Sequence, residues 1–124
     1  MESVKTFPRG PKVKIGVDLD GTVSEYPEFF SFMTRALVSA CARVHVITDR
    51  PIGTEWQVAK ELEGYGVVWD EIVITGDKAG FIAREGVEVL FDDVDQYFEA
   101  VPQSVAVFKV RQHYNYDFEQ GRWR

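Results

Sequence analysis

The chain has 124 residues, of which 45% are hydrophobic and 14% aromatic, a length and composition that suit one compact domain with an apolar core. Its formal net charge of −6 argues against a generally basic, nucleic-acid-binding surface. A single cysteine, Cys41, excludes an internal disulfide and a cysteine-based metal site, and no apolar run is long enough to cross a bilayer, so we expect an intracellular, cytoplasmic protein.

The spacing of apolar residues predicts strands and helices that alternate along the chain. Residues 1–12 contain two prolines and a glycine and are expected to form a flexible arm ahead of a single domain at 13–124. Strands are predicted at 13–17, 43–47, 71–75, 87–91 and 104–110. Helices are predicted from Pro27 onward, from a capping box of Thr54 and Gln57 to the glycines at 64 and 66, at 79–85 and at 94–100, while the last fourteen residues show no regular pattern.

Such an alternation predicts an α/β fold. We expect a single Rossmann-like domain built on a five-stranded, mainly parallel sheet with helices on both faces. Ligands of sheets of this kind bind at the carboxyl ends of the strands, so the residues at those ends are the first candidates for a functional site.

Polar side chains stand at the ends of four of the predicted strands. The stretch VKIGVDLDGTV leads from an apolar strand to two acids, Asp18 and Asp20, which a glycine follows. Their i, i+2 spacing in extended backbone is expected to turn both side chains to one face. The other strand ends lead to Thr48, Asp49 and Arg50, to Asp77 and Lys78, and to Asp92 and Asp93. In a parallel sheet, all these groups would converge at one edge.

Several carboxylates in one crevice repel each other, by about 4 kcal/mol for a pair ~4 Å apart at an effective dielectric of ~20. Such a cluster needs a cation, and oxygen ligands without cysteine or a histidine cluster favour Mg²⁺. Lys78 would add a fixed positive charge and Thr48 a hydroxyl donor, while Gly21 would allow a sharp turn that brings backbone amides toward an anion. Together these groups predict a phosphoryl-transfer site.

The order of these motifs resembles the haloacid dehalogenase-like (HAD) superfamily. DLDGTV after an apolar strand, then Thr48, Lys78 and an acidic pair after the following strands, stand in the order of that family over roughly residues 13–110. The resemblance implies a Mg²⁺-dependent phosphatase in which Asp18 is the nucleophile and forms an aspartyl-phosphate. It further implies that Asp20 protonates the leaving group, deprotonates the attacking water and binds Mg²⁺ through its backbone carbonyl.

The same resemblance implies roles for the remaining residues. Thr48 and Lys78 would hold the phosphoryl oxygens, and Asp93, with Asp92 as a second candidate, would bind Mg²⁺ together with Asp18. Contacts to the substrate are expected from Gly21, Thr22, Asp49 and Arg50. For Arg50 a surface ion pair is an equal alternative, and for the acidic pair the alternative is capping of the helix at 94–100.

The intervals between motifs bear on the substrate. About thirty residues separate Asp20 from Thr48, and Thr48 from Lys78, which leaves no room for the cap domain that many members of the superfamily carry. The resemblance therefore implies an open site that acts on an extended substrate or that a second copy closes in a homo-oligomer. ITDRP, FDD and HYNYDF also resemble the 5′(3′)-deoxyribonucleotidase-like proteins, so nucleotides are one candidate among phosphorylated small molecules, although those proteins usually have a helical cap.

Three other interpretations stay open. A response-regulator receiver domain has the same parts, but its acidic pair comes first in the chain. A catalytically silent scaffold could keep the fold, and a nucleic-acid end phosphatase suits an open site but not the charge of −6. Most of Phe29, Phe30, Phe32 and Met33 are expected in the core, with one or two in a substrate pocket, and the tail QHYNYDFEQGRW is expected to pack on the sheet edge rather than stack on a nucleobase.

Overall fold

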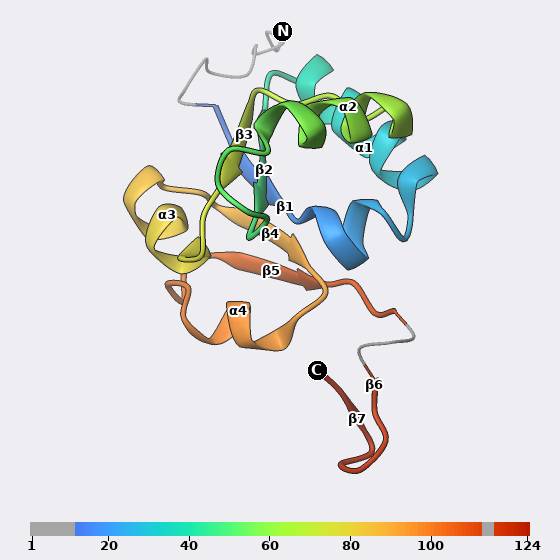
Figure 1. Ribbon diagram of the computed structural model, residues 1–124. Helices are drawn as coiled ribbons and strands as arrows, with labels where there is room; N and C mark the ends of the chain where they lie inside the picture. The colour runs from blue at the N-terminus through green and yellow to red at the C-terminus, as the bar shows by residue number, and fades with distance from the viewer. Residues whose placement is uncertain (1–11, 113–115) are drawn as a thin grey trace, which may run out of the picture.

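The computed structural model describes residues 12–112 and 116–124 (Figure 1). Five strands form one sheet in the order β3-β2-β1-β4-β5, and every pair of neighbours is parallel. Their bounds are Lys14–Val17 for β1, Arg43–Thr48 for β2, Glu71–Ile74 for β3, Val89–Asp92 for β4 and Ala106–Lys109 for β5. The predicted α/β fold with a five-stranded parallel sheet is therefore confirmed.

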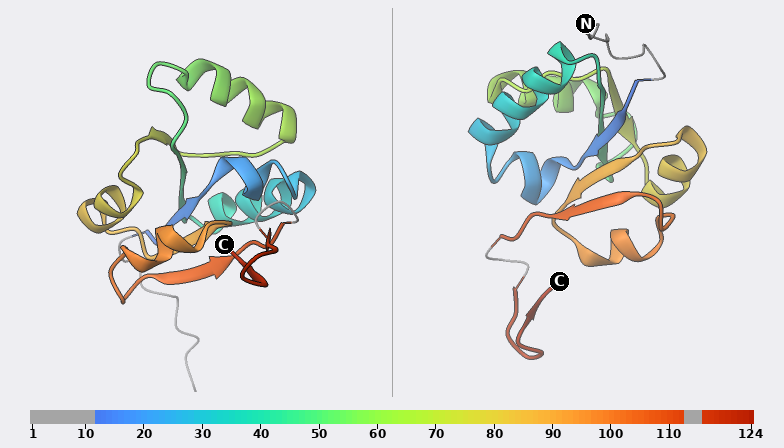
Figure 2. Two further views of the ribbon diagram at one scale, coloured as in Figure 1. Left: turned by 60° about the horizontal axis from the view of Figure 1, so that its bottom comes forward. Right: turned by 180° about the vertical axis from the view of Figure 1, so that it is seen from behind.

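Two helices pack on each face of the sheet (Figure 2). On one face α1 (Pro27–Ser39) and α2 (Glu55–Tyr65) cover β1, β2 and β3, and on the other face lie α3 (Lys78–Glu85) and α4 (Asp95–Glu99). A short turn, η1 (Leu19–Val23), in which the backbone of Asp20 and Gly21 is not helical, links β1 to α1. Each connection between consecutive strands of the sheet contains one of the four α-helices, as expected for a domain without a cap.

The alternation of side chains along the strands divides the core into two clusters. Ile15 and Val17 of β1 pack toward α1 and α2, while Leu90 of β4 belongs to the cluster on the other face, with Phe81 of α3. Gly16 lies between them in β1, where a Cβ atom would come within 2.9 Å of the side chain of Ile47. The sheet thus accepts only glycine at this position without a shift of its neighbours, and this close packing positions the carboxyl end of β1.

The structure corrects two local predictions. Thr54 precedes α2, but its hydroxyl donates to the carbonyl of Pro51 (2.7 Å) and makes no capping hydrogen bond, so the predicted capping box is wrong. The described part of the tail is not irregular: β6 (Tyr116–Asp117) and β7 (Arg122–Trp123) form an antiparallel hairpin that lies beyond the end of β5 (Figure 1). Residues 1–11 of the predicted arm and 113–115 of the tail lie outside the described residues.

The hairpin is joined to the domain by contacts at its base. Lys109, at the end of β5, donates to the backbone carbonyl of Arg124, and the guanidinium of Arg111 lies 5.1 Å from the ring of Trp123. Tyr116 packs edge-to-face on Trp123 within the hairpin, whereas Phe118 at its turn is exposed. In the described part of the chain, none of the helices has the length and apolar character that crossing a bilayer requires.

Candidate active site

The site lies where the chain changes direction across the sheet. From β1 the chain adds β2 and then β3 on one side, and it returns to place β4 on the other side of β1. The carboxyl ends of β1 and β4 therefore form the topological switch point, the place where open α/β sheets bind ligands. Asp18 follows β1 and donates its backbone amide to Phe91 of β4 (3.0 Å), while Asp92 ends β4 and Asp93 follows it.

Three carboxylates meet at this point. Asp18, Asp92 and Asp93 each place one oxygen within 4.8 Å of the others, and all three side chains are buried. Buried carboxylates without compensating charge are strongly disfavoured, because burial removes water and the low dielectric increases their repulsion. The arrangement therefore requires positive charge or protons, and its donors are all oxygen.

Lys78 supplies one positive charge from within the cluster. It is the first residue of α3, after Asp77, whose side chain caps that helix by accepting from the amide of Gly80 (3.0 Å). Its ammonium, only 2% exposed, donates to Asp18 Oδ1 (2.7 Å) and Asp92 Oδ2 (3.0 Å). One lysine neutralises only one of the three carboxylates when all are ionised. The remaining negative charge is what a divalent cation could neutralise.

The two acids at the end of β4 are held differently. Asp92 Oδ1 accepts from the backbone amides of Asp93 (2.7 Å) and Val94 (3.1 Å), and its Oδ2 binds Lys78, so this side chain mainly anchors the lysine and the turn. It does not cap α4, whose N-cap residue is Val94. Asp93 accepts from Gln112 (2.8 Å) and, at 3.5 Å, from Thr22. Of the predicted pair, Asp93 is thus the better candidate for a direct metal ligand.

The ionisation of the cluster follows from burial. Burial raises the pKa of Asp18 well above its usual value, and the nearby Asp92 raises it further, while Lys78 opposes both effects. Burial also raises the pKa of Asp92, again against the effect of Lys78. For Lys78, burial alone would lower the pKa, but the two carboxylates outweigh it and leave the pKa above its usual value. The ammonium is therefore the permanent charge, and the acids are the groups that a metal ion would help to ionise.

The turn after Asp18 brings the backbone against Asp93. The strand ends at Val17, η1 begins at Leu19, and Gly21 has a φ of 81°. A Cβ atom on Gly21 would overlap the carboxylate of Asp93 and approach Gln112 Nε2 to 3.0 Å. Thr22, in the same turn, is fully buried and donates to Asp18 Oδ2 (3.3 Å). Both predicted substrate contacts in this turn, Gly21 and Thr22, therefore border the acids directly.

We expect Gly21→Ala to weaken Mg²⁺ binding by more than its effect on stability explains. The new methyl group displaces Asp93, whereas Gly53→Ala, at a φ of 93° with nothing within 4 Å, imposes comparable backbone strain without such a contact. Calorimetric titration with Mg²⁺ should show on the order of tenfold weaker binding for Gly21→Ala only. Equal affinities for the two variants would contradict the assignment of Asp93 as a ligand.

Asp20 is not one of the three clustered carboxylates. Its backbone is extended (φ −76°, ψ 124°), and the chain turns at Gly21, which has a positive φ. The carboxylate of Asp20 instead accepts from Arg50 Nε (3.0 Å) and Nη2 (2.8 Å), and the hydrogen bond with Asp20 raises the pKa of Arg50. The same guanidinium binds Glu61 of α2 at 2.7 Å. Arg50 therefore makes the ion pair that was the alternative to a substrate contact.

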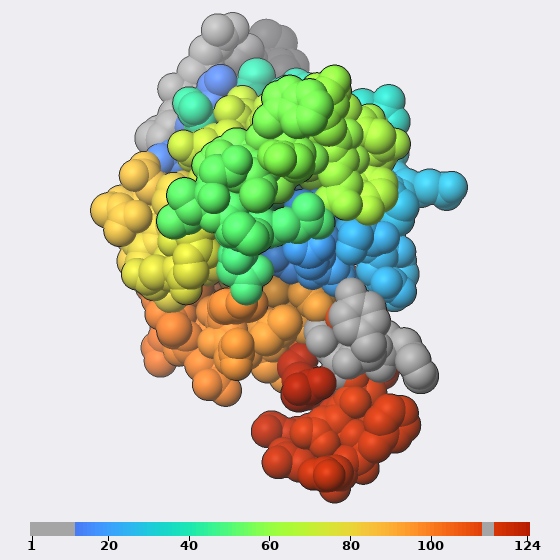
Figure 3. All heavy atoms as spheres, in the orientation of Figure 1, coloured from blue at the N-terminus to red at the C-terminus, as the bar shows by residue number. Residues whose placement is uncertain are grey.

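The end of β2 and the residues after it form the rim of the site on its other side. Thr48 is fully buried, and its hydroxyl accepts from the amide of Arg50 (3.3 Å). Asp49 is exposed and accepts from the hydroxyl of Tyr97 (3.1 Å), whose ring lies 4.2 Å from the Lys78 ammonium. In the space-filling view, the loop after β2 lies against both η1 and the region of α4 (Figure 3). Tyr97 thus links this loop to α4 and covers Lys78.

Sequence reasoning missed Tyr97, Gln112 and Glu61 as partners of the predicted residues. Each lies in or after an element that the sequence predicted, but its contact with the site is long-range: Gln112 bonds Asp93 and Glu61 bonds Arg50. The one signal in the sequence was that Tyr97 and Gln112 come within five residues of the carboxyl ends of β4 and β5, the edge of the sheet where the site was expected.

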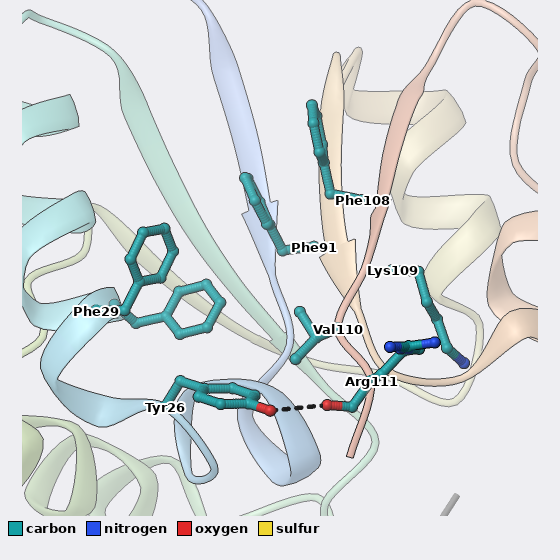
Figure 4. A pocket seen from close by; sticks show the side chains of 8 residues that line it. Tyr26, Phe29, Phe91, Phe108, Lys109, Val110 and Arg111 are labelled. Carbon is teal, nitrogen blue, oxygen red and sulfur yellow. Dashed lines mark hydrogen bonds between the residues drawn. The ribbon is translucent and has the colours of Figure 1, made fainter. Parts of the chain in front are cut away.

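An aromatic pocket of about 590 Å³ lies on the α1 side of the sheet, beside β4 and β5 (Figure 4). The stacked rings of Phe91 and Phe108, 4.9 Å apart, stand opposite Phe29, and Tyr26 closes one end by donating to the carbonyl of Arg111 (2.9 Å). Of the aromatic residues after the DLDGTV stretch, Phe30 is in the core as expected, whereas Phe29 and Phe32 are exposed. A role for Phe29 in a substrate pocket stays a prediction.

Comparisons with protein families, with curated proteins and with solved structures find no match to this chain.

Proposed function

We propose that the protein is a Mg²⁺-dependent phosphomonoester hydrolase that acts through an aspartyl-phosphate on Asp18. The observation that carries this proposal is the buried arrangement of Asp18, Asp92 and Asp93 around Lys78 at the switch point of the sheet. A chain does not bury three carboxylates around one ammonium for stability alone, because an apolar replacement is usually at least as stable. The resemblance of the motifs to the HAD superfamily supports the same activity.

The donor set suits Mg²⁺. Asp18 and Asp93 would bind the ion directly, and both offer hard oxygen ligands from buried side chains that other residues orient. When bound, the ion would neutralise charge on the acids and on the phosphoryl oxygens. Asp92, whose two oxygens bind backbone amides and Lys78, would act by fixing the lysine.

In the first step, a carboxylate oxygen of Asp18 attacks phosphorus, and the bond from phosphorus to the leaving oxygen breaks as the new bond forms. Lys78 already binds Oδ1, so we assign the attack to Oδ2, which accepts the longer hydrogen bond from Thr22. Asp20 gives a proton to the leaving oxygen, and Lys78 and Thr48 stabilise the phosphoryl oxygens.

In the second step, water attacks the phosphorus of the aspartyl-phosphate and the bond to Asp18 breaks. Asp20 takes the proton of the water, which returns both carboxyl groups to their starting state and releases inorganic phosphate. A covalent intermediate divides one very slow hydrolysis into two easier reactions, which is the advantage of a carboxylate nucleophile at this place.

The direct test is release of phosphate from p-nitrophenyl phosphate by the purified full chain in the presence of Mg²⁺. Steady turnover is expected, and EDTA should abolish it until Mg²⁺ is added again in excess. A scaffold would give no release at any pH. A receiver-like domain would incorporate phosphate from acetyl phosphate and retain it without steady turnover, and either result would reject the proposal.

Binding of Mg²⁺ should weaken as the pH falls. Because burial raises the pKa of Asp18 and Asp92, protons compete with the ion at a higher pH than they do for an ordinary carboxylate. Without metal, protonation of these two carboxyl groups favours the folded state. Their contribution to the free energy of unfolding is therefore greatest below about pH 3.9, the pKa of an aspartate in the unfolded chain. It is lost as the pH rises through their raised pKa values in the folded state. The increase in Tm on adding Mg²⁺ should therefore be larger at pH 8 than at pH 5, measured by scanning calorimetry.

A further inference from the structure

The ion pair between Asp20 and Arg50 poses a problem for the proposed reaction. Both oxygens of Asp20 accept from one guanidinium, in the two-bond geometry that arginine forms with carboxylates. The acid that must exchange a proton beside Asp18 is thus restrained at the rim of the site. Its side chain is 53% exposed, whereas that of Asp18 is 6% exposed, so the two acids occupy different environments.

Arg50 itself has a second anchor. Its Nη2 also binds Glu61 of α2 at 2.7 Å, and its backbone amide donates to Thr48 at the end of β2. If Asp20 moves away, Glu61 keeps the guanidinium in place. The Nε and Nη2 donors that Asp20 occupied then still face the rim of the site. The side chain of Arg50 is 27% exposed, so a ligand in the open site can reach it.

We propose that Arg50 is a subsite for a second anionic group of the substrate, and that this group takes the place of Asp20 on the guanidinium. The inference rests on the proposed phosphatase function and names its substrate class: a phosphomonoester that carries a further carboxylate or phosphate. Exchange of one oxyanion for another preserves both hydrogen bonds of the fork, so the restraint on Asp20 is removed without leaving Arg50 unpaired. Asp20 then reaches the leaving oxygen next to Asp18.

The selectivity follows from this exchange. A substrate with a neutral leaving group gains the phosphoryl contacts but leaves Asp20 on Arg50, so its kcat is low. A substrate with a second anion at the right distance binds Arg50 and also frees Asp20 to protonate the leaving oxygen. We therefore expect the second anion to raise kcat as well as to lower KM, whereas a simple binding contact would lower KM alone.

The test compares carboxyphenyl phosphates with their carbamoylphenyl counterparts, with the substituent in the ortho, meta or para position. The amide matches the carboxylate in size, so the difference reports the charge. The wild-type protein should prefer the carboxylate of at least one pair by on the order of tenfold or more in kcat/KM, with part of the gain in kcat. Arg50→Gln should remove the preference, and Arg50→Lys, which keeps the charge but loses the fork, should retain part of it.

The outcomes separate this inference from the proposed function. Turnover of all substrates with no preference in any pair, or a preference that survives Arg50→Gln, overturns the subsite while leaving the phosphatase intact. Absence of any turnover rejects the phosphatase, and the subsite is then decided by binding of the corresponding phosphonates. Calorimetry should show tighter binding of a carboxylated phosphonate than of its amide in the wild type but not in Arg50→Gln, and equal binding overturns the subsite.

Discussion

Asp18→Asn is expected to abolish phosphate release without destabilising the fold. Removal of the group that forms the covalent bond costs on the order of 10⁴-fold or more in kcat, because an amide is a poor nucleophile toward phosphorus. The measurement is steady-state release of phosphate from p-nitrophenyl phosphate with Mg²⁺. Substantial residual activity would mean that another residue attacks.

The stability of the same variant separates a functional cluster from a structural ion pair. Burial disfavours the ionised form of Asp18 and raises its pKa, so a neutral isostere removes a cost that the metal-free fold bears at neutral pH. Lys78 keeps its partner Asp92 at 3.0 Å. We therefore expect an unchanged or higher Tm without Mg²⁺, together with a smaller increase in Tm when Mg²⁺ is added.

The control for this measurement is Glu63→Gln, an equivalent change on an exposed side chain of α2 that pairs with Lys60 at 3.9 Å. It should alter neither activity nor the response to Mg²⁺, because surface ion pairs contribute little. If Asp18→Asn lowered the metal-free stability by 3–5 kcal/mol, the cost of breaking a buried structural pair, the cluster would be a stability device and the account would be wrong.

Lys78→Met is expected to have the opposite effect on stability. The ammonium is 2% exposed and binds both Asp18 and Asp92, so its loss leaves buried carboxylates without their shared partner. The expected loss in free energy of unfolding is about 3–5 kcal/mol at neutral pH without Mg²⁺. Lowering the pH should recover part of this loss, because protonation removes the unpaired charges.

Chemical denaturation at pH 5 and pH 8, with and without Mg²⁺, measures these terms. Mg²⁺ should partly restore the stability of Lys78→Met, while catalysis stays lost because the phosphoryl oxygens lack the ammonium. Lys60→Met, which removes an exposed lysine that contacts Glu63 and the ring of Trp56, should change stability by less than about 1 kcal/mol. Similar losses for both lysines would show that Lys78 is not the charge partner of the acids.

The fold and the cluster were predictable from the sequence because both depend on local pattern. Apolar strands that alternate with helices specify a parallel sheet. The carboxyl ends of parallel strands lie at the same edge of the sheet, regardless of the sequence that connects them. Asp92 ends its strand, and Asp18, Lys78 and Asp93 follow theirs within one to four residues, so their convergence needed no knowledge of side-chain packing.

The position of Asp20 was not predictable in this way. It depends on the turn that follows β1 and on the guanidinium that the loop after β2 supplies, and the period of the strand specifies neither. Its partner Arg50 was visible in the sequence, but the choice between a substrate contact and an ion pair depends on Glu61, which α2 brings to the rim. Contacts between elements, such as that of Gln112 with Asp93, have no local signal at all.

The most direct test of the whole account is a crystal structure of the protein grown with Mg²⁺ and beryllofluoride, which mimics a phosphoryl group on a carboxylate. We expect the beryllium bonded to a carboxylate oxygen of Asp18, with Mg²⁺ beside Asp18 and Asp93 and with the fluorines near Lys78 and Thr48. The contradicting result is a crystal in which the three acids and Lys78 keep their contacts but neither Mg²⁺ nor beryllofluoride has density at Asp18. It would show that this cluster does not receive a phosphoryl group.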